Sequence, residues 1–462
     1  MTTEKKALVP KQFLFAFILI TSLFLLWGIA NDLTNPMVSA FKKVMRELSN
    51  FEAALVQLAF YGGYATMAIP AALFIRKYSY KAGIILGLAL YATGALLFYP
   101  AAAKEEFGFF LASLYILTFG LAFLETTANP FILSMGPKET ATRRLNLAQS
   151  FNPMGSLMGM LVAQLFVIKS LQSDNLFSEN VLGSAGEILQ KKGDLIYDTL
   201  PAAEQAVIRT NDLGIISGPY IGLGILVLII LVIMAVSRMP KKQKGDSLPV
   251  GETFKKLLKN KRYREGVIAQ AFYVGAQIMC WTFIYQYVDN LNAARPESQH
   301  LTATWYNMAA MIAFLSGRWI STLLLKYLNP ARLMFFFALS AMVLTVGVIL
   351  LPGITGLYCL VGVSIFMSLM FPTIYGIALR DMGDEAKIGS AGLVMAIVGG
   401  ALMPPLQGKI LDLGGDGFAD VQLLGFIPEV AFSFVLPLIC FVVVAIYSWR
   451  SFKIHLAPTA QE

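Results

Sequence analysis

Apolar residues occur along the chain in long stretches separated by shorter polar loops. A helix that crosses a bilayer needs about 20 predominantly apolar residues, and twelve stretches reach this length. They run approximately over residues 13–39, 52–75, 82–101, 107–133, 145–168, 215–238, 265–288, 303–325, 332–352, 357–379, 389–411 and 424–449. The pattern predicts an all-α membrane protein with twelve transmembrane helices.

Composition supports the same class of protein. Hydrophobic residues fill 57% of the 462 positions and charged residues only 14%, which leaves too little polar surface for a soluble globule. The cysteines Cys280, Cys359 and Cys440 lie in apolar stretches, as core residues do, and show no ligand spacing. His300 and His455 lie outside those stretches. We therefore expect no cofactor, no disulfide framework and no histidine-ligated metal.

The positive charges orient the predicted helices. Lys and Arg gather at the N-terminus, in the loops after the second and fourth stretches, and in the loop between the sixth and seventh. By the positive-inside rule this side is cytoplasmic, which places both termini in the cytoplasm. The opposite side carries the acidic connection 169–213, with Lys42, Lys43 and Arg46 as exceptions. The net charge of +8 is concentrated in the cytoplasmic loops, so we expect no nucleic-acid partner.

A basic segment divides the chain into two similar parts. We expect a six-helix half over 1–238, a cytoplasmic linker over 239–264 and a second half over 265–462. The basic loop at 76–81, after the second stretch, has a counterpart at 326–332, after the eighth. A repeat of two six-helix halves is typical of secondary transporters, whose solute site lies between the halves.

Two carboxylates lie inside the apolar stretches, Glu125 in the fourth and Asp32 in the first. An acid at bilayer depth is energetically costly and marks a functional site by default. No P-loop, Ser/His/Asp set or zinc motif is present in the sequence. These features indicate a transporter of an ion, a polar solute or both, and not an enzyme.

Amides and aromatic rings in the spans fit a sugar site. A pyranose presents hydroxyls to amide side chains and apolar C–H faces to aromatic rings. The residues of these types are Gln57, Asn129, Gln149, Asn152, Gln270 and Gln277, with Tyr61, Tyr64, Tyr273 and Trp281. Hydrogen bonds between helices are the alternative role for the amides, and lipid-facing positions for the rings. Gln149 and Asn152 are three residues apart and share a helix face, which favours them.

Arg318, in the eighth stretch, is a third charge inside the membrane. It either pairs with an acid or holds a sugar hydroxyl. The alternative is an arginine that extends its charged end to the cytoplasmic surface.

Several motifs resemble the fucose permease-like sugar:cation symporters, the fucose–galactose–glucose:cation symporters of the major facilitator superfamily. The matching segments are LETTANPF at 124–131, RLNLAQSFN at 144–152, AFYVGAQ at 271–277, SYKAGII at 79–85 and MSLMFPT at 367–373. The resemblance runs through nearly all twelve spans. It implies uptake of a hexose or related monosaccharide across the inner membrane, driven by a cation gradient through alternating access of the two halves.

The resemblance also implies roles for two acids. The family's span-four glutamate corresponds to Glu125, but its span-one aspartate falls on Asn35. Asp32 stands where the family's permease has asparagine. Either Asp32 has taken over the role, or coupling runs through Glu125 alone, or the ion differs. Phe371 replaces a family tyrosine, which leaves the identity of the sugar open.

The resemblance favours the proton as coupling ion, bound and released by Glu125. The alternative is sodium, which prefers oxygen ligands of the kind found on Asp32, Asn31, Thr34 and Asn35. A weaker alternative is a receptor or sensor that binds sugar without moving it. We expect a monomer whose partners are the monosaccharide and the membrane lipid.

Overall fold

The computed structural model describes residues 7–34, 37–48, 50–175, 181–182, 188–190, 196–237, 239, 249–293, 295–296, 299–351, 353–411, 422–423 and 427–455. Nearly all of them are helical. Two antiparallel pairs of very short strands occur in loops, β1 (Val181–Leu182) with β2 (Ile188–Gln190), and β3 (Gln422–Leu423) with β4 (Ile427–Pro428).

The first half contains the helices that correspond to spans one to six. They are α1 (Lys11–Thr34), α3 (Asn50–Lys77), α4 (Tyr80–Leu96) with α5 (Phe98–Lys104), α6 (Phe107–Ser134), α7 (Ala141–Gln149) with α8 (Phe151–Val162), and α10 (Ala202–Val236). Two short helices, α2 (Met37–Val44) and α9 (Gln172–Asn175), lie in its loops. Short 3-10 segments are η1 (Lys138–Thr140), η3 (Ile168–Ser170) and η4 (Tyr197–Thr199), and η2 (Ala163–Val167) is a π segment.

The second half repeats this order. Its helices are α12 (Lys261–Thr282) with α13 (Ile284–Ala293), α14 (Ala303–Leu324), α15 (Pro330–Leu350), α16 (Ile354–Met367) with α17 (Met370–Ala378), α18 (Ala386–Met395) with α19 (Gly399–Leu411), and α20 (Glu429–Phe432) with α21 (Val435–Arg450). Short segments are η6 (Gly383–Glu385), η7 (Ala396–Val398) and the π segment η9 (Ser451–His455). An amphipathic helix, α11 (Val250–Lys259), lies between the halves in sequence.

Eleven segments of the described chain are long and apolar enough to cross a membrane. The remaining predicted span, 303–325, is the 22-residue helix α14, which carries buried polar residues such as Asn307, Arg318 and Ser321. These polar side chains lower the hydropathy of the helix, and they are buried inside the protein. The predicted all-helical fold is confirmed. All three cysteines are unpaired, with Cys280 and Cys440 buried and Cys359 half-buried.

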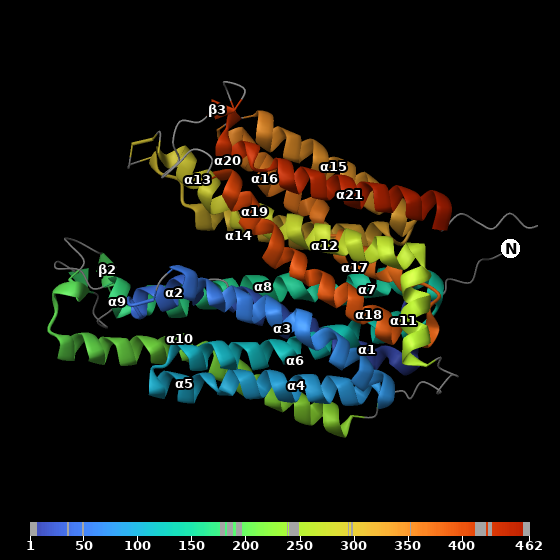
Figure 1. Cartoon of the computed structure of the whole chain (residues 1–462), viewed down its shortest axis with the longest axis horizontal. Coiled ribbons are helices and arrows are strands. Elements are labelled where there is room, and N and C mark those ends of the chain that lie inside the picture. Colours follow the sequence, from blue (N-terminus) through green and yellow to red (C-terminus); the bar gives the residue numbers. More distant parts are fainter. Residues whose placement is uncertain are drawn as a thin grey trace, which may run out of the picture.

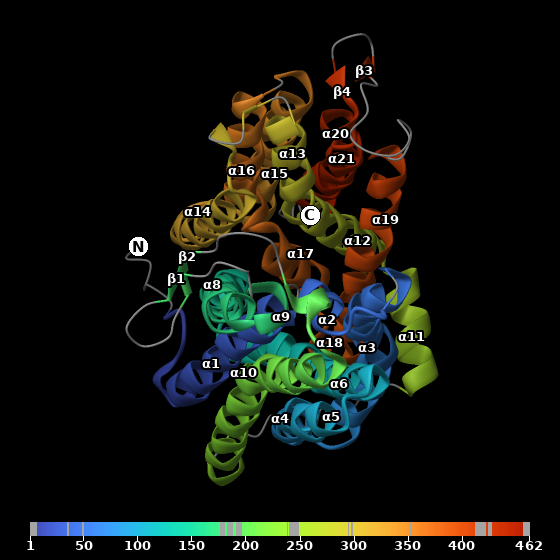
Figure 2. The same ribbon diagram turned by 90° about the vertical axis from the view of Figure 1, so that its left-hand side faces the viewer.

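The helices form two groups, blue to green and yellow to red in Figure 1, that pack against each other along their length. In the turned view of Figure 2 the first half lies below the second. Helix α3 contacts α18, and α14 contacts α8. In each case the second span of one half contacts the fifth span of the other half: α3 and α14 are the second spans, and α8 and α18 belong to the fifth. The two contacts are therefore equivalent when the halves are interchanged. The fold therefore has the internal symmetry that a repeat predicts.

Helices α1 and α8 approach each other at backbone distance. A Cβ atom on Gly28 would lie 2.0 Å from the Asn152 carbonyl oxygen, and one on Gly155 would lie 1.9 Å from that of Leu25. Only glycine fits at either position, as is common where membrane helices pack closely. Across this contact Asn152 Nδ2 of α8 donates to the Phe24 carbonyl of α1.

We call one end of the molecule the basic end, because the first half carries Arg76, Lys81, Lys138 and Arg143 there. At this end the two halves are bridged to each other. One ion pair crosses between the halves here, with Lys138 Nζ 3.1 Å from Asp381 Oδ1. Two hydrogen bonds run from the first half to the second, from Asn146 Nδ2 to Thr373 Oγ1 (3.3 Å) and from Arg143 Nε to the Thr322 carbonyl (3.4 Å). One runs the other way, from Ser390 Oγ to the Thr126 carbonyl (3.0 Å). Helix α11 spans the same end, because Arg76 Nη1 donates to Thr253 Oγ1 (3.2 Å) and Lys256 Nζ pairs with Glu385 Oε1 (2.6 Å). Both halves are therefore joined at the basic end.

At the opposite end, three ion pairs among the described residues join segments of the first half to one another. Arg46 pairs with Asp198 (2.7 Å), and Arg209 pairs with Glu47 (2.8 Å) and Glu105 (3.4 Å). These contacts tie the connection between the fifth and sixth spans to neighbouring loops.

Candidate functional site

A cavity of about 140 Å³ lies between the halves, about midway along the helices; we call it the central cavity. Its wall combines residues of α1, α3, α6 and α8 with residues of α12, α14 and α17. It shares Asp32, Tyr61 and Trp281 with a larger cavity of about 900 Å³, the outer cavity, which extends toward the end opposite the basic end. Lys43, Tyr285 and Thr304 line the outer part of that path.

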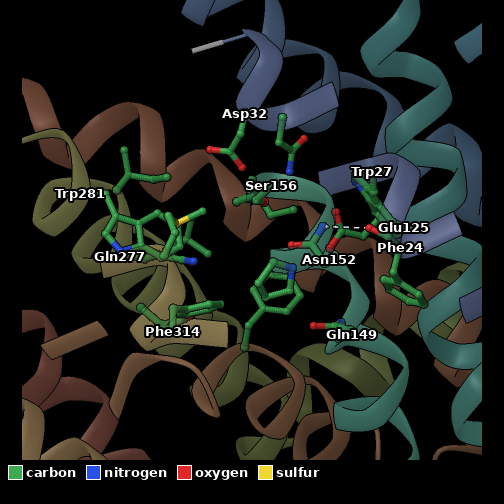
Figure 3. Close-up of a pocket in the computed structure, with 18 of the residues that line it drawn as sticks. Phe24, Trp27, Asp32, Glu125, Gln149, Asn152, Ser156, Gln277, Trp281 and Phe314 are labelled. Atoms are coloured by element: carbon green, nitrogen blue, oxygen red, sulfur yellow. Dashed lines mark hydrogen bonds between the residues drawn. The ribbon is translucent and has the colours of Figure 1, made fainter. Parts of the chain in front are cut away.

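Glu125 comes from α6 and points into the central cavity (Figure 3). Its side chain is 7% exposed, and it has no ion-pair partner in the part of the chain that the structure describes. Pro130, one turn further along, has no N–H to donate to the Thr126 carbonyl. That carbonyl instead accepts from Ser390 Oγ of the second half. Glu125 therefore directly precedes Thr126, a residue whose backbone carbonyl is hydrogen-bonded to the second half.

A chain of hydrogen bonds links Glu125 to the second half. Asn129 Nδ2 donates to the Glu125 carbonyl (3.1 Å), and Gln149 Nε2 donates to Asn129 Oδ1 (2.8 Å). Arg318 Nη1 of α14 lies 3.4 Å from both the Gln149 carbonyl and Gln149 Oε1. Pro153 cannot donate to the Gln149 carbonyl, which leaves that oxygen available to Arg318. Gln149 lines the cavity, whereas Asn129 is fully buried behind it.

Arg318 is buried on the cavity wall, 3% exposed, with its guanidinium 5.0 Å from the centre of the Phe314 ring. No carboxylate among the described residues forms an ion pair with it, and its Nε has no hydrogen-bond partner there. The expectations of an acid partner and of a side chain that reaches the cytoplasmic surface do not match this geometry. Contact with a sugar hydroxyl stays a prediction.

Three of the four residues of the sodium hypothesis are described by the structure, and two of these reach the central cavity. Asp32 and Asn31 line the central cavity, and the buried Asn31 Oδ1 has no partner within the described chain. Thr34 lines neither cavity; its hydroxyl donates to the Ala30 carbonyl (2.8 Å) and lies 3.1 Å from the Tyr220 hydroxyl. Asn35 lies outside the described residues. The structure thus brings together two of the proposed ligands.

The remaining predicted sugar residues reach the cavity in most cases. Tyr61, Tyr273, Gln277, Trp281 and Asn152 all line it, whereas the side chain of Gln57 lies outside the described residues. Asn152 Nδ2 donates to the Phe24 carbonyl (3.3 Å), which is the dashed line in Figure 3. Their part in binding stays a prediction.

Aromatic rings flank the cavity on both sides; Tyr64 and Trp281 were predicted from the sequence, whereas Phe24, Trp27 and Phe314 were not. Trp27 stacks on Phe24 with ring centres 5.2 Å apart, and its Nε1 donates to the Tyr64 hydroxyl (2.9 Å). On the other half Trp281 packs edge-on against Phe314, with centres 5.1 Å apart. Figure 3 shows these two pairs on opposite sides of Asn152. The spacing of Phe24, Trp27 and Asn31 at i, i+3 and i+7 was the signal that would have found the first pair.

Comparison with known proteins places these features in a family context. The model of the Major Facilitator Superfamily matches residues 12–182 and 210–404. The L-fucose-proton symporter of Haemophilus influenzae is 55% identical over 448 residues, which cover 96% of this chain and 98% of that protein. The L-fucose-proton symporter of Escherichia coli is 32% identical (96% and 95%), and a putative glucose/galactose transporter of Helicobacter pylori is 30% identical (94% and 96%).

Solved structures agree with these matches. The crystal structure of the transporter FucP in the outward conformation has 31% sequence identity and a TM-score of 0.78, and the match covers 95% of this chain and 99% of that one. A proton:xylose symporter structure with 13% identity and a TM-score of 0.63 shares the fold.

Proposed function

The chain belongs to the major facilitator superfamily, and from this premise we propose that it is a sugar–proton symporter that carries L-fucose or a related hexose into the cell. The observation that carries this proposal is the central cavity between the halves, which combines a buried carboxylate with amides and paired aromatic rings. The protein is a multi-pass transporter of the inner membrane and not an enzyme.

L-Fucose is the first choice of substrate because the relative with 55% identity over nearly the whole chain is an L-fucose-proton symporter. Glucose and galactose rank second, since the relative named for them is 30% identical. The sugar would lie between the Trp27 and Trp281 sides of the cavity, with its apolar faces toward the rings. Gln149, Asn152 and Gln277 would hold its hydroxyls, as would Arg318, whose Nε has no partner among the described residues.

Glu125 would carry the proton. Removing a carboxylate from water penalises its charged form, so closure of the cavity around the sugar favours the neutral acid. Contact with cytoplasmic water after reorientation favours ionisation and release. Sodium coupling at Asp32 is not supported by the relatives, which are named proton symporters, and Thr34 does not contribute an oxygen at that place.

The basic end would be the cytoplasmic one, with both termini on that side. The bridges at the basic end and the outer cavity at the other end then correspond to an outward-facing state. We assign residues 1–238 and 265–462 to the two halves and 239–264, which includes α11, to the cytoplasmic linker. We further propose that the transporter works as a monomer without a cofactor.

Uptake of radiolabelled L-fucose into proteoliposomes tests the proposal, with an inward proton gradient and an inward sodium gradient imposed separately. We expect accumulation with the proton gradient alone. Accumulation with the sodium gradient alone would contradict proton coupling. Counterflow of labelled against unlabelled sugar separates a carrier from a sensor, because a sensor exchanges no sugar across the bilayer.

A further inference from the structure

Below the central cavity, toward the basic end, lies a second layer of polar side chains. Three helices each place one polar residue about one turn from a residue of the cavity wall, and a fourth places one directly after a wall residue. Asn146 precedes Gln149 on α7, Gln270 precedes Tyr273 on α12, Tyr375 follows Phe371 on α17, and Thr126 follows Glu125 on α6. A turn rises about 5 Å, so Asn146, Gln270 and Tyr375 lie roughly that far along their helices from the cavity wall.

These four side chains are fully buried, with exposed fractions of 0%. Thr126 Oγ1, Asn146 Oδ1 and both amide atoms of Gln270 have no hydrogen-bond partner within the described chain, whereas the Tyr375 hydroxyl lies near the side chains of Ser390 and Asn129. A buried polar atom without a partner destabilises the conformation that contains it, whereas an apolar side chain of the same size would not. The arrangement therefore indicates a second conformation in which these atoms have partners.

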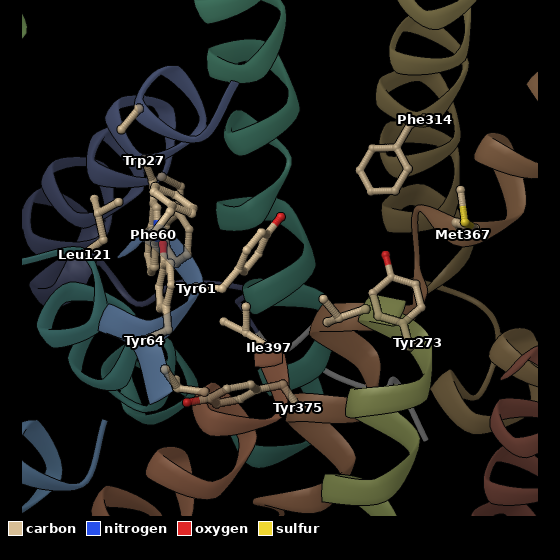
Figure 4. Close-up of a cluster of buried hydrophobic side chains, with 14 of the residues drawn as sticks. Trp27, Phe60, Tyr61, Tyr64, Leu121, Tyr273, Phe314, Met367, Tyr375 and Ile397 are labelled. Atoms are coloured by element: carbon tan, nitrogen blue, oxygen red, sulfur yellow. Dashed lines mark hydrogen bonds between the residues drawn. The ribbon is translucent and has the colours of Figure 1, made fainter. Parts of the chain in front are cut away.

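The layer is closed on both sides in the present conformation. Figure 4 shows Tyr375 below Ile397, on the side away from Phe314. Ile397 belongs to the wall of the central cavity, whereas Tyr375 does not line it. On the other side the bridges from Asn146 to Thr373 and from Ser390 to the Thr126 carbonyl join the halves. Separation of the halves at the basic end would uncover all four residues together.

The chemistry of the layer matches a sugar. Two amides and two hydroxyls offer both donors and acceptors, and the Tyr375 ring adds an apolar face. The same combination lines the central cavity. We propose that Thr126, Asn146, Gln270 and Tyr375 form a second sugar subsite, the inner subsite, which holds the hexose during its release at the basic end. This inference rests on the proposed sugar transport and adds a site to it.

Gln270 offers the cleanest test, because its amide has no bond to lose in the present conformation. We measure the KM for sugar presented at the basic end as uptake by inverted vesicles. In Gln270→Leu we expect this KM to rise at least about tenfold. The KM for sugar presented at the opposite end should stay within about twofold of wild type. Gln286→Leu is the matched control, since Gln286 also has a buried amide oxygen without a partner but lines neither cavity. It should change neither KM. Equal changes at both ends, or none, would overturn the inner subsite.

A labelling experiment makes the inference independent of uptake. Gln270→Cys, with Cys280, Cys359 and Cys440 replaced by Ala, should react with a membrane-impermeant maleimide in inverted vesicles. L-Fucose, galactose or glucose should slow that reaction. No reaction, or a reaction that none of these sugars slows, would overturn the subsite. Failure of wild-type sugar uptake with labelling and sugar protection intact would instead overturn the proposed transport.

Discussion

Glu125 is the side chain on which proton coupling depends in this account. It is buried, lies on the cavity wall and has no charged partner in the described chain. Glu125→Gln keeps the shape and hydrogen-bonding capacity of the protonated acid but cannot release a proton. We expect the variant to lose proton-driven accumulation of L-fucose in proteoliposomes and to retain sugar-for-sugar exchange. Full accumulation would remove Glu125 from the coupling step.

Gln149 and Asn152 test where the sugar binds. If both hold hydroxyls, Gln149→Ala or Asn152→Ala should weaken binding by about 1–3 kcal/mol, because a sugar hydroxyl and its surroundings lose a partner. Calorimetry of L-fucose binding to the purified protein measures this, with Gln286→Ala as a control outside both cavities. Wild-type affinity in both variants would reassign the two amides to helix packing, a role that their bonds to Asn129 and to the Phe24 carbonyl already illustrate.

Asp32 lines both cavities and is the second acid on the path. If Asp32 takes part in proton coupling together with Glu125, Asp32→Asn should flatten the dependence of uptake on external pH in sodium-free medium. Uptake that keeps the wild-type response to pH and to sodium would exclude a coupling role for Asp32.

The place of some residues in the site could be predicted from the sequence, and that of others could not. Glu125 could be predicted because a charge in an apolar stretch has few explanations. Gln149 and Asn152 could be predicted from their shared face. Thr34 was misplaced beside Asp32 because residues two apart on a helix point in different directions. Trp27 could be predicted from its spacing to Phe24 and Asn31, whereas Phe314 could not be separated from lipid-facing aromatic residues without the packing of the two halves.

At the scale of helices, two prolines of the first half each leave a carbonyl group that accepts a hydrogen bond from the second half. Pro130 leaves the Thr126 carbonyl without its helical donor, and Pro153 does the same for Gln149. Both carbonyls accept from the second half, one from Ser390 Oγ and one from Arg318 Nη1. The sequence predicts that such prolines free carbonyl groups. It does not say where the new donors come from, because that depends on how the halves dock.

The contact between α1 and α8 makes a second prediction at this scale. A Cβ atom on Gly155 would meet the Leu25 carbonyl at 1.9 Å, so Gly155→Ala must push the helices apart and displace Asn152 from its place beside α1. We expect a loss of L-fucose transport of at least about tenfold, or of folded protein in detergent. Gly218→Ala on α10 is the control, since nothing lies within 4 Å of its Cβ. Equal behaviour of the two variants would show that the close contact is dispensable.

At the scale of the whole molecule, the two six-helix halves could be predicted from the repeat of basic loops at 76–81 and 326–332. The conformational state could not. Both states of an alternating-access carrier share one sequence and differ by a small free energy, so local patterns do not select between them. Contacts such as Lys138 with Asp381 and Lys256 with Glu385 identify the closed end only in the folded structure.

Proton movement that accompanies sugar entry tests the central claim most directly. L-Fucose added to proteoliposomes without any imposed ion gradient, in a weakly buffered and sodium-free medium, moves inward down its own gradient. Symport predicts a transient rise of external pH that depends on the sugar and disappears with a protonophore. Entry of L-fucose without a pH change, or entry that requires added sodium, would contradict the account.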